Sequence, residues 1–169
     1  MEFLRIKAKL KLDPLQQYNV SRISYNGKSK LPLEIKLMDN KFASRITAVV
    51  LSNIVLKDSD PIVKKRLELC GQSTINNVVD ISNYIRMSLG QPCHIFDYDQ
   101  IAKHRMIVRE SKKGEVVITL DKERVTLPGN DIVIEDGSGK LIDQPGIMGA
   151  YNSSVQKSTK NIVLFVPIF

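Results

Sequence analysis

The chain has few of the residues that build disulfide scaffolds, metal sites or membrane spans. Its two cysteines, Cys70 and Cys93, are too far apart for a C-x-x-C pair, and no cluster of histidines accompanies them. A disulfide scaffold and a zinc site are therefore excluded, and we expect both cysteines to be small apolar fillers. The longest apolar stretches, at 48–51 and 164–169, are far shorter than a membrane-spanning helix.

No apolar run follows the initial Met, so the first residues do not resemble a secretion signal. We expect a cytoplasmic protein with no membrane partner. The composition is typical of one soluble globular domain, with 169 residues of which 43% are apolar and 25% charged. A chain of this length buries roughly 70% of the surface that it exposes when unfolded. A disordered tail and a collagen-like fibre are excluded.

Positive charge is concentrated in the first third of the chain. The net charge is +7, of which +6 falls on residues 1–59 and +1 on residues 60–169. Such an excess attracts the phosphates of nucleic acids, and it also serves simply to keep a small protein soluble. Both explanations stay open at this point.

Period-two patterns predict strands in the first and last thirds of the chain. Residues 3–12 alternate basic and apolar side chains, which is typical of an edge strand. Residues 33–38 and 45–56 are expected to form an antiparallel pair around a polar turn at 39–41. Further strands are expected at 106–109, 115–120, 123–127, 131–136, 140–142 and 161–169.

Two amphipathic helices are expected between these groups of strands. Ser59 and Asp60 are N-cap candidates ahead of Pro61, and apolar residues follow at helical spacing until Gly71. The second helix ends at Gly90 and should pack on a sheet. Its apolar residues are Ile75, Val78, Ile81, Ile85 and Leu89. The fold class is therefore α+β, with mostly antiparallel β-sheet structure and two central helices.

Two segments in and after the second helix carry candidate chemistry. The helix bears a polar stripe of Asn76, Asp80 and Asn83, which either bonds to the backbone of neighbouring loops or forms a solvated face. In the loop at 90–97, Pro92 fixes the backbone just before His94. His94 is either a general base that orients water or a structural histidine that caps a loop carbonyl.

A glycine-bearing segment at 145–150 is the third candidate. It lacks the Gly-Lys-Ser/Thr ending of a phosphate loop, and no helix is expected after it. Its glycines would let the backbone approach a ligand or a neighbouring strand closely. With no paired carboxylates or metal-ligand spacing, the residues alone predict only a pocket formed by two loops.

Taken in order, four segments of the chain resemble one known family. The segments 70–101, 107–127, 131–136 and 145–169 closely resemble the beta subunits of bacterial phenylalanyl-tRNA synthetases, in their central tRNA-editing domain. The combination of INNVVDISNY with GQPCHIFD is highly specific. The resemblance divides the chain into an unassigned basic segment, 1–31, and an editing-type domain, 32–169.

The resemblance implies a heterotetrameric ligase that attaches phenylalanine to tRNA-Phe with ATP and magnesium in its alpha subunit. None of that chemistry belongs to this segment, for which we expect neither cofactor nor metal. In the family this domain hydrolyses mischarged tyrosyl-tRNA, because the synthetic site cannot fully exclude a substrate that only adds a hydroxyl. The family's pocket residues fall on Pro92, His94 and Gly149, although no residue is assigned a catalytic role.

Departures from the family pattern indicate that this editing function is lost or severely weakened. The glutamate that accepts a hydrogen bond from the tyrosine hydroxyl is Phe165 here, and a phenyl ring cannot accept that bond. A small residue of the family is Ile95, and the second glycine of a Gly-Gly pair is Ala150, which we expect to crowd the pocket. The isolated domain is therefore expected to be inactive.

Two alternatives stay open beside this interpretation. One is an active editing domain, or a free-standing deacylase that hydrolyses mischarged tyrosyl-tRNA-Phe. The other is a non-catalytic tRNA-binding module that depends on the basic first third. Because the sequence finishes in an apolar strand at 161–169, we expect it to be part of a longer protein, with further pocket residues beyond it.

Overall fold

The computed structural model describes residues 31–168, so the predicted edge strand at 3–12 lies outside the described residues. The helices are α2 (Pro61–Leu69) and α3 (Asn77–Leu89). The strands are β1 (Glu34–Leu37), β2 (Arg45–Leu51), β3 (His94–Asp97), β4 (Arg105–Glu110), β5 (Val116–Ile118), β6 (Arg124–Thr126), β7 (Ile132–Asp136), β8 (Leu141–Gln144), β9 (Met148–Gly149) and β10 (Ile162–Ile168). Short 3-10 turns occupy Asn40–Phe42, Tyr98–Gln100, Ala102–His104 and Tyr151–Ser153.

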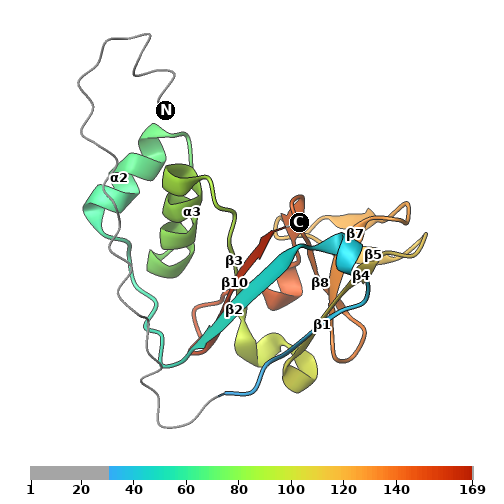
Figure 1. The fold of residues 1–169 in the computed structure, drawn as a ribbon. Helices are drawn as coiled ribbons and strands as arrows, with labels where there is room; N and C mark the ends of the chain where they lie inside the picture. The colour runs from blue at the N-terminus through green and yellow to red at the C-terminus, as the bar shows by residue number, and fades with distance from the viewer. Residues whose placement is uncertain (1–30, 169) are drawn as a thin grey trace. The chain divides into compact units, whose positions relative to one another are not determined.

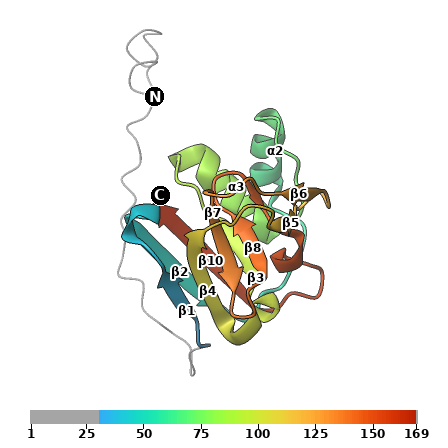
Figure 2. The ribbon, with the colours of Figure 1, turned by 90° about the vertical axis from the view of Figure 1, so that its right-hand side faces the viewer.

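The strands form two larger sheets and a hairpin (Figures 1 and 2). The first sheet has the order β1-β4-β7-β8-β9 and the second the order β2-β10-β3, while β5 pairs with β6. Every pairing is antiparallel except that of β1 with β4. The α+β class with mostly antiparallel sheets is confirmed.

The predicted antiparallel pair at 33–38 and 45–56 is wrong. β1 pairs with β4 in the first sheet, whereas β2 pairs with β10 in the second, so the two strands belong to different layers. The segment between them forms a 3-10 turn that Asp39 caps by accepting a hydrogen bond from the Lys41 amide. Because this turn is not a hairpin, it directs β2 to the other sheet.

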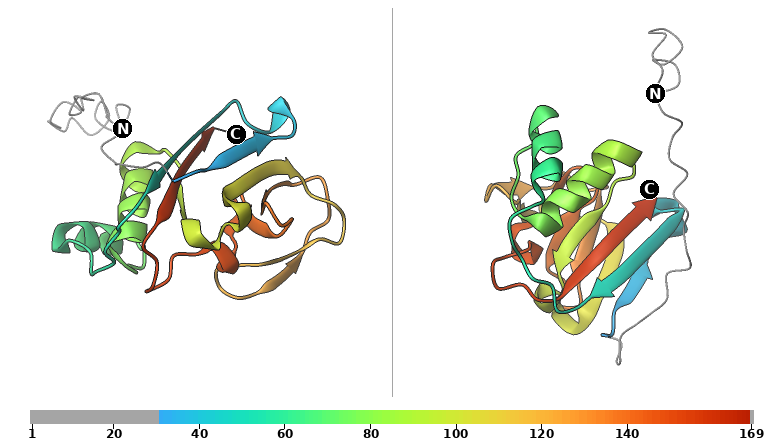
Figure 3. Two further views of the ribbon diagram at one scale, coloured as in Figure 1. Left: turned by 90° about the horizontal axis from the view of Figure 1, so that it is seen from below. Right: turned by 90° about the vertical axis from the view of Figure 1, so that its left-hand side faces the viewer.

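The main core lies between the two larger sheets. Phe96 of β3 and Phe165 of β10 pack with Met106, Ile134 and Ile142 from the first sheet, and all five are fully buried. A smaller cluster joins the β5–β6 hairpin to the β7–β8 strands. Figure 3 shows β2, β10 and β3 side by side, forming one wall of this arrangement.

The two helices lie together at one end of the domain, and α3 contacts β3 (Figure 1). Asp60 caps α2 by accepting a hydrogen bond from the Ile62 amide, and Pro61 occupies the first turn as predicted. Asn76 caps α3, and Gly90 ends it in the left-handed conformation, with φ of 71°. Within residues 31–168, neither helix is long and apolar enough to cross a bilayer.

The buried face of α3 is not its predicted apolar stripe. Val78 is buried, but Ile75, Ile81 and Leu89 are more than half exposed. The helix instead turns Asp80 inward, where its carboxylate accepts hydrogen bonds from the Ser59 hydroxyl and the Ile75 amide. Asp80 therefore connects the helix to neighbouring segments, whereas Asn76 bonds to the amides of Val78 and Val79 in the first turn of α3 itself.

Candidate ligand-binding pocket

A pocket of about 780 Å³ lies between two strand pairs that are distant in sequence. β3 and β10 supply one wall, and β8, β9 and the turn that joins them supply the opposite wall. Leu120, at the end of the β5–β6 hairpin, contributes an apolar side chain. The rim is formed by Asn83 and Arg86 of α3 and by the segment 91–93. The two loops predicted from the sequence thus meet at one cavity.

His94 and Phe165 are direct neighbours across the β3–β10 pair. Residues that face each other in antiparallel strands point to the same side of the sheet, and both side chains line the pocket. Phe96 packs edge-to-face against both rings, with centroid distances of 4.4 Å to His94 and 5.8 Å to Phe165. The aromatic contacts fix the position of the imidazole.

Position 149 requires a glycine, because any side chain there would collide with His94. A Cβ atom at this position would lie 2.6 Å from Cε1 of His94 and 3.2 Å from Cδ1 of Leu120. The carbonyl of Gly149 also accepts a hydrogen bond of 3.0 Å from the Leu120 amide, which joins the hairpin to β9. The predicted close approach of a glycine to a neighbouring strand therefore occurs. The absence of a side chain at Gly149 leaves room for the imidazole of His94.

The structure brings four of the six predicted pocket residues together. Pro92, His94, Gly149 and Phe165 all line the pocket. The sequence predicts that His94 lies in a loop. In the structure it begins strand β3, which pairs with β10. The proline two residues earlier precedes the strand and sits exposed on the rim.

Ile95 and Ala150 are not among the residues that line this pocket. Successive side chains of a strand point to opposite faces, so Ile95 points away when His94 points in. Ala150 is 1% exposed because it packs in the smaller core cluster with Val117 and Leu141. Of the three expected departures that concern the pocket, Phe165 alone reaches it.

The imidazole of His94 is uncharged at neutral pH. Burial lowers its pKa to about 4, because an apolar environment disfavours the charged form. Within residues 31–168 it has no carboxylate partner that would hold it as a strong base. Such a histidine can accept a hydrogen bond from a water or a ligand, but it is a weak proton acceptor.

Asp143 is a pocket residue that the sequence analysis missed. It lies in β8 directly opposite Gly149 and is 5% exposed. Burial raises the pKa of its carboxyl to about 7, and only the neighbouring Gln144 amide acts against this shift. A carboxyl with a raised pKa and a histidine with a lowered pKa in one cavity are typical of a functional site.

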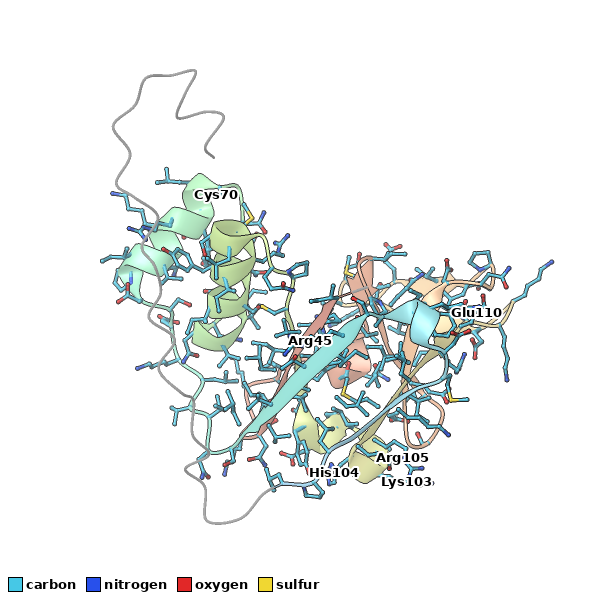
Figure 4. All side chains as sticks on the ribbon, viewed as in Figure 1. Arg45, Cys70, Lys103, His104, Arg105 and Glu110 are labelled. Atoms are coloured by element: carbon cyan, nitrogen blue, oxygen red, sulfur yellow. The ribbon has the colours of Figure 1, made fainter. Side chains whose placement is uncertain are left out.

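The rim is more polar than the walls. Arg86 donates a hydrogen bond of 3.0 Å to the Gln72 side chain, and its positive charge partly offsets the burial that raises the pKa of the Cys93 thiol. Cys93 contacts the Ser82 carbonyl and is half-buried, while Cys70 is exposed at the end of α2 (Figure 4). Among the described residues, the rim thus presents one cation, Arg86, to the mouth of the pocket.

Other titratable groups of the described residues lie outside this pocket. His104 is half-buried and stacks on Tyr98 with 4.2 Å between ring centroids. It lies beside Lys103 and Arg105 at the start of β4 (Figure 4). Residues 31–168 contain no group of three His, Cys, Asp or Glu side chains that could hold a metal ion.

Known proteins match this chain over most of its length. A family model described as the B3/4 domain matches residues 43–169. The chain is 40% identical to the phenylalanine–tRNA ligase beta subunit of Dehalococcoides mccartyi over 136 residues, which cover 80% of this chain and 17% of the relative. It is 35% identical to that of Clostridium tetani over 152 residues, which cover 88% of this chain and 19% of the relative. The chain thus spans about a fifth of these relatives' length.

A solved structure shares the fold. It is an N-terminal fragment of the phenylalanyl-tRNA synthetase beta subunit from Pyrococcus horikoshii, with a TM-score of 0.57 and 14% identity over 82% of this chain and 45% of that chain. At this identity the likeness concerns the fold alone. The resemblance to synthetase beta subunits seen in the sequence is confirmed by these matches, and the chain belongs to the B3/4 domain family.

Proposed function

We propose that this chain is an editing-type domain of a phenylalanine–tRNA ligase beta subunit and that its pocket no longer selects tyrosine. The ligase would act in the aminoacylation of tRNA-Phe, with tRNA-Phe and an alpha subunit as partners. ATP and magnesium would be used in that alpha subunit. The proposal is supported by the beta-subunit relatives and by a pocket that unites Pro92, His94 and Gly149.

Phe165 is the residue that accounts for the loss of tyrosine selection. It is one of the residues around the pocket, at the position of the family's glutamate, and its side chain is fully buried against Phe96 and the core between the sheets. A phenyl ring offers no acceptor for a phenolic hydroxyl. Losing a charged acceptor forfeits on the order of 1.5 to 3 kcal/mol, which is roughly tenfold or more in the preference for tyrosine over phenylalanine.

His94 supports a weakened hydrolysis rather than an efficient one. Its pKa of about 4 makes it neutral at physiological pH, and its position against Gly149 leaves it able to orient a water. Without a carboxylate to stabilise its protonated form, it would remove a proton from that water only slowly. We therefore expect a low rate that is similar for tyrosyl and phenylalanyl esters.

The test compares deacylation of two aminoacylated tRNAs. Tyrosyl-tRNA-Phe and phenylalanyl-tRNA-Phe are incubated with the 169-residue chain and, in parallel, with the assembled ligase that contains it. We expect hydrolysis near the uncatalysed rate in both cases, with less than about a threefold preference for tyrosine. His94→Ala is the control for any residual hydrolysis by the pocket.

Fast hydrolysis that prefers tyrosine by more than tenfold, and that His94→Ala abolishes, would overturn the proposal in favour of an active editing domain. Phe165→Gln tests the specificity step without placing a charge in the core. If the proposal is right, this amide should restore part of the preference for tyrosine where the fold tolerates it. Circular dichroism and thermal unfolding of the variant show whether the fold is kept.

A further inference from the structure

Strands β1 and β2 belong to different sheets, and both lie at the edge of their sheet on the same side of the domain (Figures 2 and 3). Within residues 31–168, β1 pairs only with β4, and β2 pairs only with β10. The other edge of each strand therefore presents backbone N–H and C=O groups that no strand of the described residues binds. An edge of this kind can accept an extended peptide as a further strand.

Strand β2 has none of the features that usually prevent such an addition. Its seven residues contain no proline, and they pair with Ile162–Ile168 without a shift of register. The side chains that it packs against the core are Ile46, Ala48 and Val50, so no charge points inward. Proline, bulges and inward charges are common means of blocking a sheet edge. Their absence from β2 leaves its edge open to a partner.

A cavity of about 530 Å³ lies between the two edge strands and shares no residue with the pocket described above. Its apolar walls are Ile35 and Leu37 of β1 and Ile46 of β2, which also pack against the main core. Ser44 contributes to the lining, and its amide and hydroxyl both donate to the Ile168 carbonyl, at 2.8 and 3.1 Å. The cavity is thus preformed, and it can receive the apolar side chains of a strand added to β2.

Arg45 is the only charged residue of β2, and it also lines the cavity. Its side chain is exposed, and within residues 31–168 it forms no ion pair. The nearby acids have other partners, because Glu34 of β1 is bound by Arg105 at 2.7 Å and Asp39 is paired with Lys41 at 3.5 Å. A carboxylate on an added strand would compensate the charge of Arg45.

We propose that the free edge of β2 is a docking site for an extended protein segment from outside this chain, in which apolar and polar residues alternate and a carboxylate lies opposite Arg45. Backbone hydrogen bonds to β2 hold the segment, and the cavity and Arg45 select its side chains. The inference goes beyond the proposed function and does not use the pocket between β3–β10 and β8–β9.

The test uses a fluorescein-labelled, amidated peptide of sequence TVTITVE. In an antiparallel arrangement its glutamate lies opposite Arg45, and its apolar residues lie opposite Ile46, Ala48 and Val50. Binding to the 169-residue chain is measured by fluorescence anisotropy, with TVTITVK as the control peptide. We expect TVTITVE to bind about fivefold more tightly than TVTITVK. Shifts in the NMR spectrum should be concentrated at residues 34–37 and 44–51.

Backbone hydrogen bonding is tested with two N-methylated forms of TVTITVE. One form is methylated on the amides of its apolar residues and the other on the amides of its threonines. In an antiparallel pair only alternate amides point toward the neighbouring strand. One form should therefore lose more than about tenfold in affinity while the other keeps it. Equal affinities of the two forms would show that the peptide does not add as a strand, and would overturn the proposal.

Arg45→Gln tests the charge selection. It should bring the affinities of TVTITVE and TVTITVK to within about twofold of each other. Lys36→Gln is the matched control, because Lys36 is an exposed cation of the neighbouring strand β1 that does not line the cavity. It should leave the preference for TVTITVE intact. Loss of the preference in both variants alike would reflect the total charge of the protein and would overturn the role of Arg45.

Sedimentation velocity of the 169-residue chain alone tests a competing occupant, a second copy of the chain. We expect a monomer. A dimer that TVTITVE dissociates would overturn the proposal, because β2 would then pair with the same strand of another molecule. No binding of the peptide up to about 1 mM would overturn it as well. Neither result bears on the proposed function, which the deacylation assay tests independently.

Discussion

Two aspartates on neighbouring strands are buried to a similar extent but differ in their hydrogen-bond donors and in the direction of their pKa shifts. Asp136 ends β7 and is 2% exposed, while Asp143 lies in β8 and is 5% exposed. The Asp136 carboxylate accepts hydrogen bonds from the Ser138 amide at 2.8 Å, the Ser138 hydroxyl at 2.6 Å and the Lys140 amide at 3.1 Å. Burial acts to raise the pKa of Asp136, but these bonds together hold that pKa below its usual value. For Asp143 only the backbone amide of Gln144 acts against burial, which raises the pKa of its carboxyl to about 7.

The difference separates a region that serves stability from one that serves binding. In the turn at 136–140, the backbone supplies donors that satisfy the buried charge. In the pocket wall at 143–149, the buried Asp143 carboxyl is stabilised by the backbone amide of Gln144 alone, and a glycine keeps space open beside His94. A buried carboxyl with little stabilisation and open space both destabilise a fold, so they are expected where binding and not stability is served.

The largest expected effect is that of Asp143→Asn on stability at alkaline pH. Since the folded state keeps this proton up to about pH 7 and the unfolded state releases it near pH 4, the stability of the natural protein falls as pH rises between these values. Asn cannot ionise. We expect the variant to be more stable by up to about 4 kcal/mol above pH 8 and equally stable at pH 4 or below.

Urea unfolding at a series of pH values measures this difference, and the contribution of His94 cancels because both proteins contain it. Loss of stability in the variant at pH 8 would show that the carboxylate already has a favourable partner. The contrast between the two aspartates would then be wrong.

Asp136→Ala should have the opposite sign. Removing the carboxylate leaves the turn amides of Ser138 and Lys140 without their acceptor, so we expect a loss of roughly 3 kcal/mol at pH 7. Because the folded pKa is lowered, this stabilisation is present above the usual pKa near 4 and is lost as pH falls below it. Urea unfolding between pH 3 and pH 7 should show the difference shrinking on acidification.

Asp136→Asn keeps one acceptor oxygen and is expected to cost less than the alanine variant. A loss that does not depend on pH would mean that the side chain acts through packing and not through its charge.

Gly149→Ala tests whether the open space of the pocket wall is needed by His94. The added methyl would meet Cε1 of His94 at 2.6 Å, so the imidazole must move. We expect a loss of roughly 2 kcal/mol, as for other overpacked sites. We also expect the pKa of His94 to rise from about 4 as the displaced ring reaches solvent, which proton NMR of its Cε1–H resonance measures.

Gly146→Ala is the matched control from the same wall. Its φ of 78° makes alanine strained, but no atom lies within 4 Å of the added methyl. It should therefore reduce stability without moving the His94 titration. If both variants shift that titration alike, the effect comes from the backbone of the β8–β9 turn and not from the contact with His94.

Local signals predicted the helices well and the strand pairing only in part. Asp60 and Pro61 start α2 and Gly90 ends α3 because caps depend on residues adjacent in sequence. The partner of β1 is β4, some 70 residues away, and nothing in the pattern of residues 33–38 specifies that pairing. β9 has only two residues, too few for any periodicity to appear.

The residues of the pocket were likewise only in part predictable from the sequence. Pro92, His94, Gly149 and Phe165 were predicted from a family resemblance, and the geometry unites them. Asp143 was missed because the predicted strand ended at residue 142, since aspartate is rare in strands. All four residues of β8 are buried, so the strand has no alternating pattern. The signal present in the sequence was an acid directly after two apolar residues and ahead of a Pro-Gly turn.

The smallest expected effect is that of Asn76→Ala, which tests a hydrogen-bonded residue that does not line the pocket. The Asn76 side chain accepts hydrogen bonds from the Val78 amide at 3.1 Å and the Val79 amide at 3.0 Å, and so caps α3. Its loss should cost about 1 kcal/mol, which lowers Tm by about 3 °C. Asn76→Asp keeps the cap and adds a negative charge at the helix N-terminus, so it should be at least as stable as the natural protein. Neither variant should move the His94 titration, whereas a shift would show that the start of α3 is coupled to the pocket, and that stability and binding are not divided between separate regions.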